Sequence, residues 1–175
     1  MKKNIVFAFI FIFISVNSNT QNDKYLQKVK TLDNTIKTLY GVISGEKGEA
    51  RDWELFKYLF RSEAKLIPSG SNKEGKTTIR YMTPQDYINS SGDFLINSGF
   101  YEKEIARTVH KFGNIAQVFT TYEAFNHQNR SKPFMTGINS IQMIYMEGRW
   151  WIVNIFWQQA SKKHPIPKEF MPKNK

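Results

Sequence analysis

Some residues of this chain are of types that perform acid–base chemistry and stand among apolar neighbours. Asp52 stands beside Trp53 at the start of a predicted helix, and His110 stands near the end of a predicted strand. A carboxyl or an imidazole buried among apolar groups has a shifted pKa, so it can act as an acid or a base near neutral pH. Asp52 and His110 are therefore the two candidate catalytic residues.

Each candidate also has a purely structural interpretation. A carboxylate in the first turn of a helix complements the helix dipole and caps free amides, which suits Asp52. His110 alternates with Thr108 along its strand, which suits a surface histidine or a hydrogen-bonded structural one. A third carboxyl, that of Glu123, could pair with Arg107 across the sheet. The sequence leaves these alternatives open.

The composition argues against several other kinds of site. The chain has no cysteine and 3 histidines, of which His127 and His164 fall in a polar loop and in the C-terminal tail. We therefore expect no metal site and no cofactor. Residues 70–77, GSNKEGKT, match the phosphate-binding loop pattern letter for letter. The β-prone residues that follow would not supply the helix on which that loop depends, so we expect no nucleotide binding.

The first 20 residues have the features of a secretory signal peptide. Lys2 and Lys3 precede an apolar run from Ile5 to Val16, and small polar residues follow it. This run is shorter than the roughly 20 residues that a membrane-spanning helix needs. We therefore expect a cleaved signal peptide and a secreted or periplasmic protein that leaves the membrane after cleavage.

The chain is basic, with 25 lysines and arginines against 15 aspartates and glutamates. These residues form no stripe with interleaved aromatic side chains, so nucleic acid is not an expected partner. Their clearest cluster lies in residues 161–175, which also contain prolines. We expect an extended basic tail there, after a single domain at residues 21–160.

The spacing of apolar residues predicts three helices and then a sheet. Helical spacing covers residues 23–44 and 53–60, and Thr83-Pro84 is typical of the start of a third helix that ends near residue 96. Short extended segments are expected at residues 64–69 and 77–82. Four longer strands should form an antiparallel meander at residues 100–112, 114–126, 135–146 and 148–158. The predicted fold class is α+β.

The last of these strands, GRWWIVNIFWQ, is apolar on both of its faces. A half-buried strand normally alternates apolar and polar residues, so both faces need a cover. We expect one face to meet the helices and a cavity, and the other to meet a second copy of the chain. The face that carries Asn154 is preferred for the cavity, since pockets contain an occasional polar group. Its other members are Trp150, Ile152 and Phe156.

Aromatic and amide side chains of these elements could line the cavity. The expected lining residues are Tyr40, Trp53, Tyr58, Tyr87, Asn139, Asn154, Phe156 and Trp157. Their rings, hydroxyls and amides would suit a small hydrophobic or aromatic ligand. The alternative is that the same residues simply pack the core.

The order of these elements resembles that of the NTF2-like superfamily. The segments that carry the resemblance are DWELFKYLF, FGNIAQVFTTYE and GINSIQMIYMEGRWWIVNIFWQ, and it covers roughly residues 24–160. The chain is most similar to secreted bacterial members related to the SnoaL-like group. The resemblance implies an NTF2-like (cystatin-like) cone, with three N-terminal helices packed on a strongly curved, mainly antiparallel sheet. It also implies a homodimer formed through the sheet face.

The resemblance leaves two kinds of function open. The superfamily contains isomerases, dehydratases and hydrolases as well as binding proteins, so the fold alone does not choose between them. The chain shows neither the two carboxylates and tyrosine of the isomerases nor the histidine pair of the dehydratases. We therefore expect a homodimer that binds a small hydrophobic ligand. The alternative is a SnoaL-type isomerase, dehydratase or hydrolase that uses Asp52 or His110.

Overall fold

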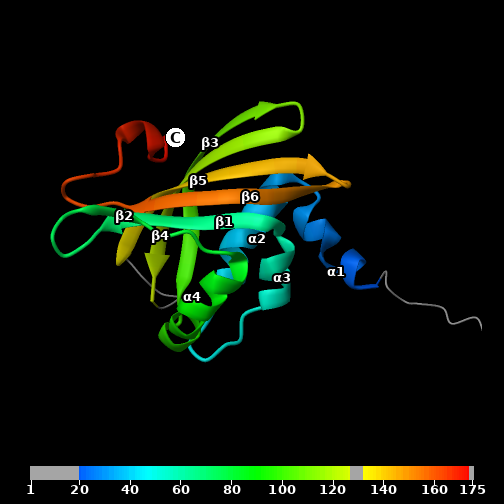
Figure 1. Ribbon diagram of the computed structural model, residues 1–175, viewed down its shortest axis with the longest axis horizontal. Coiled ribbons are helices and arrows are strands. Elements are labelled where there is room, and N and C mark those ends of the chain that lie inside the picture. Colours follow the sequence, from blue (N-terminus) through cyan, green and yellow to red (C-terminus); the bar gives the residue numbers. More distant parts are fainter. Residues whose placement is uncertain (1–19, 127–131, 174–175) are drawn as a thin grey trace, which may run out of the picture.

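The computed structural model describes residues 20–126 and 132–173 (Figure 1). Apart from Thr20, the predicted signal peptide therefore lies outside the described residues, and so does His127. Within the described ranges, no helix is both long and apolar enough to cross a membrane.

Between residue 20 and the meander the structure has four α-helices, where the sequence predicted three. They are α1 (Thr20–Val29), α2 (Leu32–Ile43), α3 (Trp53–Tyr58) and α4 (Pro84–Ser98). The prediction of one helix over residues 23–44 was wrong because the chain turns at Thr31. The backbone of Thr31 is extended, and its side chain accepts a hydrogen bond from the amide of Asn34, which starts α2.

The six strands form a single mixed sheet. They are β1 (Phe60–Ser71), β2 (Thr77–Ile79), β3 (Tyr101–Phe112), β4 (Ile115–Phe125), β5 (Met135–Met146) and β6 (Arg149–Gln159). The strand order is β2-β1-β6-β5-β4-β3, and β1 is parallel to β6 while every other pair is antiparallel. The predicted α+β class and the four-stranded meander are confirmed. Figure 1 shows the helices together on one side of the curved sheet.

The segment that matches the phosphate-binding loop is a β-hairpin. Its turn is closed by the side chain of Asn72, which accepts hydrogen bonds from the amides of Glu74 and Lys76. Gly75 has a φ of 79°, a conformation that favours glycine. β2 then begins at Thr77, so no helix starts at the lysine, as the sequence predicted.

The start of α4 was predicted correctly. Thr83 and Asp86 form a reciprocal capping box, and Pro84 occupies the first turn. The helix ends at Gly99, whose φ is 62°. A side chain at this position would meet the backbone of Lys47, so glycine is required there on two grounds.

A β-bulge in β6 reverses the expected faces of the last strand. Ile152 pairs with Met143 and Asn154 pairs with Gln142, which leaves Val153 without a partner in β5. Beyond the bulge the odd-numbered residues turn toward the helices. The preference for the Asn154 face as the cavity side was therefore wrong for the second half of the strand.

The basic tail lies on the face of the sheet opposite the helices. Thr120 faces inward, where its hydroxyl is hydrogen-bonded to Tyr40 of α2. The next residue, Thr121, donates to the carbonyl of Phe170 in a short 3-10 helix, η1 (Lys168–Phe170). The rings of Phe119 and Phe170 are 5.1 Å apart. The tail thus covers part of the outer face of the sheet, as Figure 1 shows in red.

Arg51 joins the helices to one another. Its side chain is buried, and it donates hydrogen bonds to the carbonyls of Ile43 at the end of α2, Gly45 and Glu49 in the following loop, and Leu95 in α4. Four carbonyls thereby obtain a donor from one guanidinium, whose planar fork suits several acceptors at once.

We predict that Arg51→Lys lowers the free energy of unfolding by about 3 kcal/mol, since an ammonium cannot reach all four carbonyls and buried acceptors lose their donors. Chemical denaturation monitored by tryptophan fluorescence measures this loss. The control is Arg80→Lys, because Arg80 is exposed. Equal stability of the two variants would contradict the role of Arg51.

Candidate functional site

A cavity of about 230 Å³ lies between the helices and the inner face of the sheet. Most of its wall is hydrophobic. The lining residues are Leu39, Ile43, Phe56, Leu66, Tyr87, Ser91, Phe94, Leu95, Phe100, Glu102, Tyr122, Met135, Asn139, Ile155 and Trp157. They come from α2, α3, α4 and five of the six strands, or from positions next to these elements, so the fold as a whole shapes this space.

Among the described residues that line the cavity, Glu102 is the one with a carboxyl group. β3 places it there because Glu102 pairs with Ala124 of β4, whose small side chain leaves room on the inner face. Its backbone is fixed to the hydroxyl of Ser44 at the end of α2. Its carboxyl oxygens, by contrast, have no hydrogen bond or ion pair to any described residue. Burial without a partner raises the pKa of this carboxyl to about 8.

Two tyrosines of the wall lie near this carboxyl. Burial raises the pKa of Tyr87 and of Tyr122, and the negative charge of Glu102 raises both further. The hydroxyl of Tyr122 lies over Gly137 of β5, where any Cβ would clash with it. Glycine at this position therefore allows the Tyr122 side chain to lie across the inner face. Both hydroxyls stay protonated at neutral pH and can donate hydrogen bonds.

A second polar group of the wall is the side-chain amide of Asn139 in β5. The amide of Asn139 donates to the hydroxyl of Tyr40 over 3.0 Å, and this hydroxyl is 2.7 Å from that of Thr120. Burial raises the pKa of Tyr40. The hydrogen bonds among these three side chains fix the orientation of the Asn139 amide. Its carbonyl oxygen and its second N–H can therefore bind a polar group of a ligand.

The structure places three of the eight predicted lining residues on the cavity wall, namely Tyr87, Asn139 and Trp157. Tyr40 lies directly behind Asn139. Trp53 packs instead on Phe56 and against Gly92 of α4. Tyr58 packs on Tyr25 and Trp151 at another part of the core. Asn154 and Phe156 point away from the cavity because of the bulge in β6.

The two predicted catalytic residues do not line the cavity. Asp52 is exposed and caps α3, with its carboxyl accepting from the amide of Leu55 and from the hydroxyl of Tyr25. His110 is exposed in β3 and pairs with Gln117 of β4. The position of each residue therefore agrees with its structural interpretation, and neither is among the residues that line the cavity.

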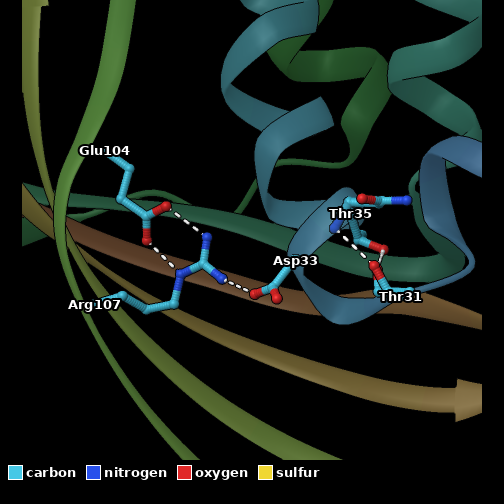
Figure 2. A network of polar contacts seen from close by, with 6 residues as sticks. Thr31, Asp33, Thr35, Glu104 and Arg107 are labelled. Carbon is cyan, nitrogen blue, oxygen red and sulfur yellow. Dashed lines mark hydrogen bonds and ion pairs between the residues drawn. The ribbon is translucent and has the colours of Figure 1, made fainter.

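The predicted cross-strand partner of Glu123 was wrong. Glu123 forms an ion pair of 3.1 Å with Lys103. Arg107 instead lies between Glu104, at 2.5 Å, and Asp33 of α2, as Figure 2 shows. These contacts raise the pKa of Arg107, chiefly through Glu104. The resulting network ties the edge strand β3 to α2, beside the segment that carries Glu102.

Sequence reasoning missed Glu102 because β3 contains a bulge. Glu104 pairs with Tyr122 and Ala106 pairs with Thr121, so Ile105 is the extra residue. Before the bulge the even-numbered residues Glu102 and Glu104 therefore lie on the inner face. Beyond the bulge the odd-numbered residues, such as Arg107, lie on that face. In the sequence FYEKEIARTVHKF, an unbroken alternation puts the acidic residues on the face opposite Ile105 and Val109. A change of phase near Ile105 was the signal that could have revealed them.

The chemistry available to the cavity is therefore that of one carboxyl among aromatic and aliphatic groups. A carboxyl with a pKa of about 8 can give or take a proton near neutral pH, and it can also bind a polar group of a ligand. Among the described residues, no group of three or more histidines, cysteines and carboxylates could hold a metal ion.

Comparison with protein-family models and with curated proteins finds no match for this chain. Solved structures do match. A protein of unknown function with a cystatin-like fold from Nostoc punctiforme has a TM-score of 0.56 and 10% identity, over 75% of this chain and 90% of its own. An NTF2-like protein of unknown function from Silicibacter pomeroyi has a TM-score of 0.53 and 14% identity, over 79% and 98%.

A third similar structure, from Parabacteroides distasonis, is provisionally named a ketosteroid isomerase. Its TM-score is 0.51 at 11% identity, over 75% of this chain and 89% of its own. At such identities the similarity shows the fold alone. The chain has the NTF2-like (cystatin-like) fold, which confirms the resemblance predicted from the sequence.

We predict that Glu102→Gln stabilises the protein in a pH-dependent way. The folded pKa is raised above the unfolded value, so between about pH 4.5 and pH 8 the unfolded state binds fewer protons than the folded state. The stability of the natural protein should fall over this range, by at most about 1.4 kcal/mol per pH unit, and level off above it. The amide variant lacks this loss.

Denaturation of both proteins at several pH values measures the difference. The two should be similarly stable near pH 4, and the variant should be the more stable near pH 9. Glu123→Gln is the control, because its carboxyl faces away from the cavity beside Lys103. The same pH profile for the natural protein and Glu102→Gln would disprove the assignment of a raised pKa.

Proposed function

We propose that this protein is secreted or periplasmic and binds a small hydrophobic or aromatic ligand in its cavity, as a homodimer. The single observation that carries the proposal is the unpartnered carboxyl of Glu102 in an otherwise apolar wall. Glu102 is half-buried, and a core that served stability alone would gain by replacing it with an apolar residue, since partial removal of a charge from water without a partner is costly. Its presence is explained by a ligand group that binds to it.

The wall chemistry supports an apolar ligand with a polar end. Aliphatic and aromatic side chains form most of the lining, while Glu102 and Asn139 offer polar atoms at two separate points. Cavities of this kind bind through removal of apolar surface from water, at roughly 25 cal/mol per Å², and use their few polar groups for orientation. Phe94 is 54% exposed at the rim, where it extends the apolar wall to the surface.

A proton-transfer enzyme of the SnoaL type is the second candidate. The observation that favours it is again Glu102, which takes over the role that the sequence assigned to Asp52 or His110. A general base should have a pKa near the working pH, and the hydroxyls of Tyr87 and Tyr122 could stabilise a developing oxyanion. The two candidates differ in outcome, because an enzyme returns an altered molecule whereas a binding protein releases its ligand unchanged.

We predict that Ser91→Trp abolishes ligand binding. Ser91 lies on the cavity wall in α4, so an indole at this position should fill the space. Asn89→Trp is the matched control, because Asn89 lies on the exposed side of the same helix. Native mass spectrometry of protein purified from its source reads the bound mass directly. Ligand retained by Ser91→Trp as well as by the control would place the binding site elsewhere.

The outer face of the sheet supports the homodimer. Ile115 of β4 is 57% exposed and Phe156 of β6 is 43% exposed, and both lie on this face next to the part that the tail covers. Phe112, beside Ile115 at the end of β3, is 84% exposed. Exposed apolar groups that share one face of a sheet on a soluble protein commonly mark an interface. A two-fold related copy would cover them with the same groups.

We predict that Ile115→Lys shifts the protein from dimer to monomer, because the interface would bring two like charges together without partners. Light scattering coupled to size exclusion measures the mass. Ile79→Lys is the control, since Ile79 is 50% exposed on the distant edge strand β2. A natural protein that is already monomeric at micromolar concentration would refute the proposed dimer.

A further inference from the structure

The charges around the cavity are of one sign. Its wall contains the carboxyl of Glu102 and, among the described residues that line it, no lysine, arginine or histidine. Arg51 binds the carbonyls of Ile43 and Leu95, which belong to the wall, but its guanidinium donates hydrogen bonds to these and two other carbonyls and does not line the cavity. Arg107 is likewise held by Glu104 and Asp33.

The rest of the wall is unusually rich in aromatic rings. Six of the lining residues are aromatic: Phe56, Tyr87, Phe94, Phe100, Tyr122 and Trp157. Several of the rings are in contact, since Phe56 stacks on Tyr87 at 5.4 Å and Tyr87 meets the edge of Trp157 at 6.4 Å. The faces of such rings carry negative electrostatic potential and attract cations.

We infer that the ligand is a small hydrophobic amine, whose ammonium group pairs with the carboxylate of Glu102 while its hydrocarbon or aromatic part fills the cavity. This inference rests on the proposed binding function and specifies the class of ligand. It follows from the juxtaposition of one unpaired carboxyl with several aromatic rings in a space that holds no cation of its own.

The alternatives fit less well on electrostatic grounds. An anionic ligand would meet the charge of Glu102 and the π faces with repulsion in an apolar surrounding, where charges interact strongly. A neutral alcohol or ketone could form one hydrogen bond, yet it would leave the carboxyl without a counter-charge. An ammonium group supplies both the hydrogen bonds and the charge that this carboxyl lacks.

The groups that face Glu102 make its titration simple to interpret. Three of these groups are tyrosines that stay neutral below the range in which tyrosine ionises, namely Tyr87 from α4, Tyr122 from β4 and Tyr40 from α2. The fourth is Glu104 on the same strand, which is paired with Arg107. Burial alone raises the pKa of Glu102, to about 8. A bound ammonium group would lower this pKa, so the amine should displace a proton at neutral pH and bind more tightly as the pH rises toward 9.

Three one-ring probes of matched shape test the inference on the full mature protein. They are 3-phenylpropylamine, 3-phenylpropanol and 3-phenylpropanoate, with affinities measured by calorimetry at about pH 8.5, where Glu102 is mostly ionised. We expect the amine to bind at least about tenfold more tightly than the alcohol, and the carboxylate to bind most weakly. At about pH 6.5, two buffers of different ionisation heat should reveal the release of close to one proton per bound amine.

The variant Glu102→Gln should lose the preference for the amine over the alcohol, together with the proton release. Glu123→Gln should retain both. Equal affinity of the natural protein for amine and alcohol would overturn the inference, and so would a preference that survives Glu102→Gln. The proposed binding function itself fails if none of the three probes binds and mass spectrometry also shows that the natural protein carries no ligand.

Discussion

The guanidinium of Arg51 fixes the spacing on which the cavity depends. It binds carbonyls at the end of α2, in the loop that follows, and in α4, so it determines how far α4 lies from α2. Ile43 and Leu95, whose carbonyls it holds, are both wall residues. Hydrophobic contact alone has no preferred direction and would draw these helices together. A rigid fork that binds four carbonyls between them keeps a hollow open where close packing is otherwise the rule.

The sheet contributes the complementary half of the cavity through its small residues and its irregularities. Ala124 and Gly137 leave space on the inner face, opposite Glu102 and beneath Tyr122 respectively. The bulges at Ile105 and Val153 change which residues face inward at the wide part of the sheet. Burial of Glu102 without a partner lowers stability, and proteins commonly accept such a cost where a group serves binding or catalysis. The arrangement thus combines a rigid frame with one locally unfavourable group.

The sequence revealed the regular parts of this fold and missed its interruptions. The strand at residues 135–146 shows clear periodicity, and the helix that begins after Thr83 has a capping signal. The positions of both were therefore predicted closely. The break between α1 and α2 was missed because apolar spacing continues across Thr31, while capping by this side chain is a local effect. The structure places Tyr87, Asn139 and Trp157, which the sequence offered as lining residues, on the cavity wall. Glu102 and the inner position of Ile155 were not foreseen, since each lies within three residues of a bulge that changes which side chains face inward.

The position of the basic tail affects how the protein can be handled and extended. Its η1 turn rests on Phe119 and Thr121, on the side of the sheet away from the helices, and the described chain continues from there to Lys173. The wall of the cavity is formed on the other side. A fluorescent protein or an immobilisation handle joined to the C-terminus would therefore crowd the surface through which two copies are proposed to meet, and would leave access to the hollow unobstructed.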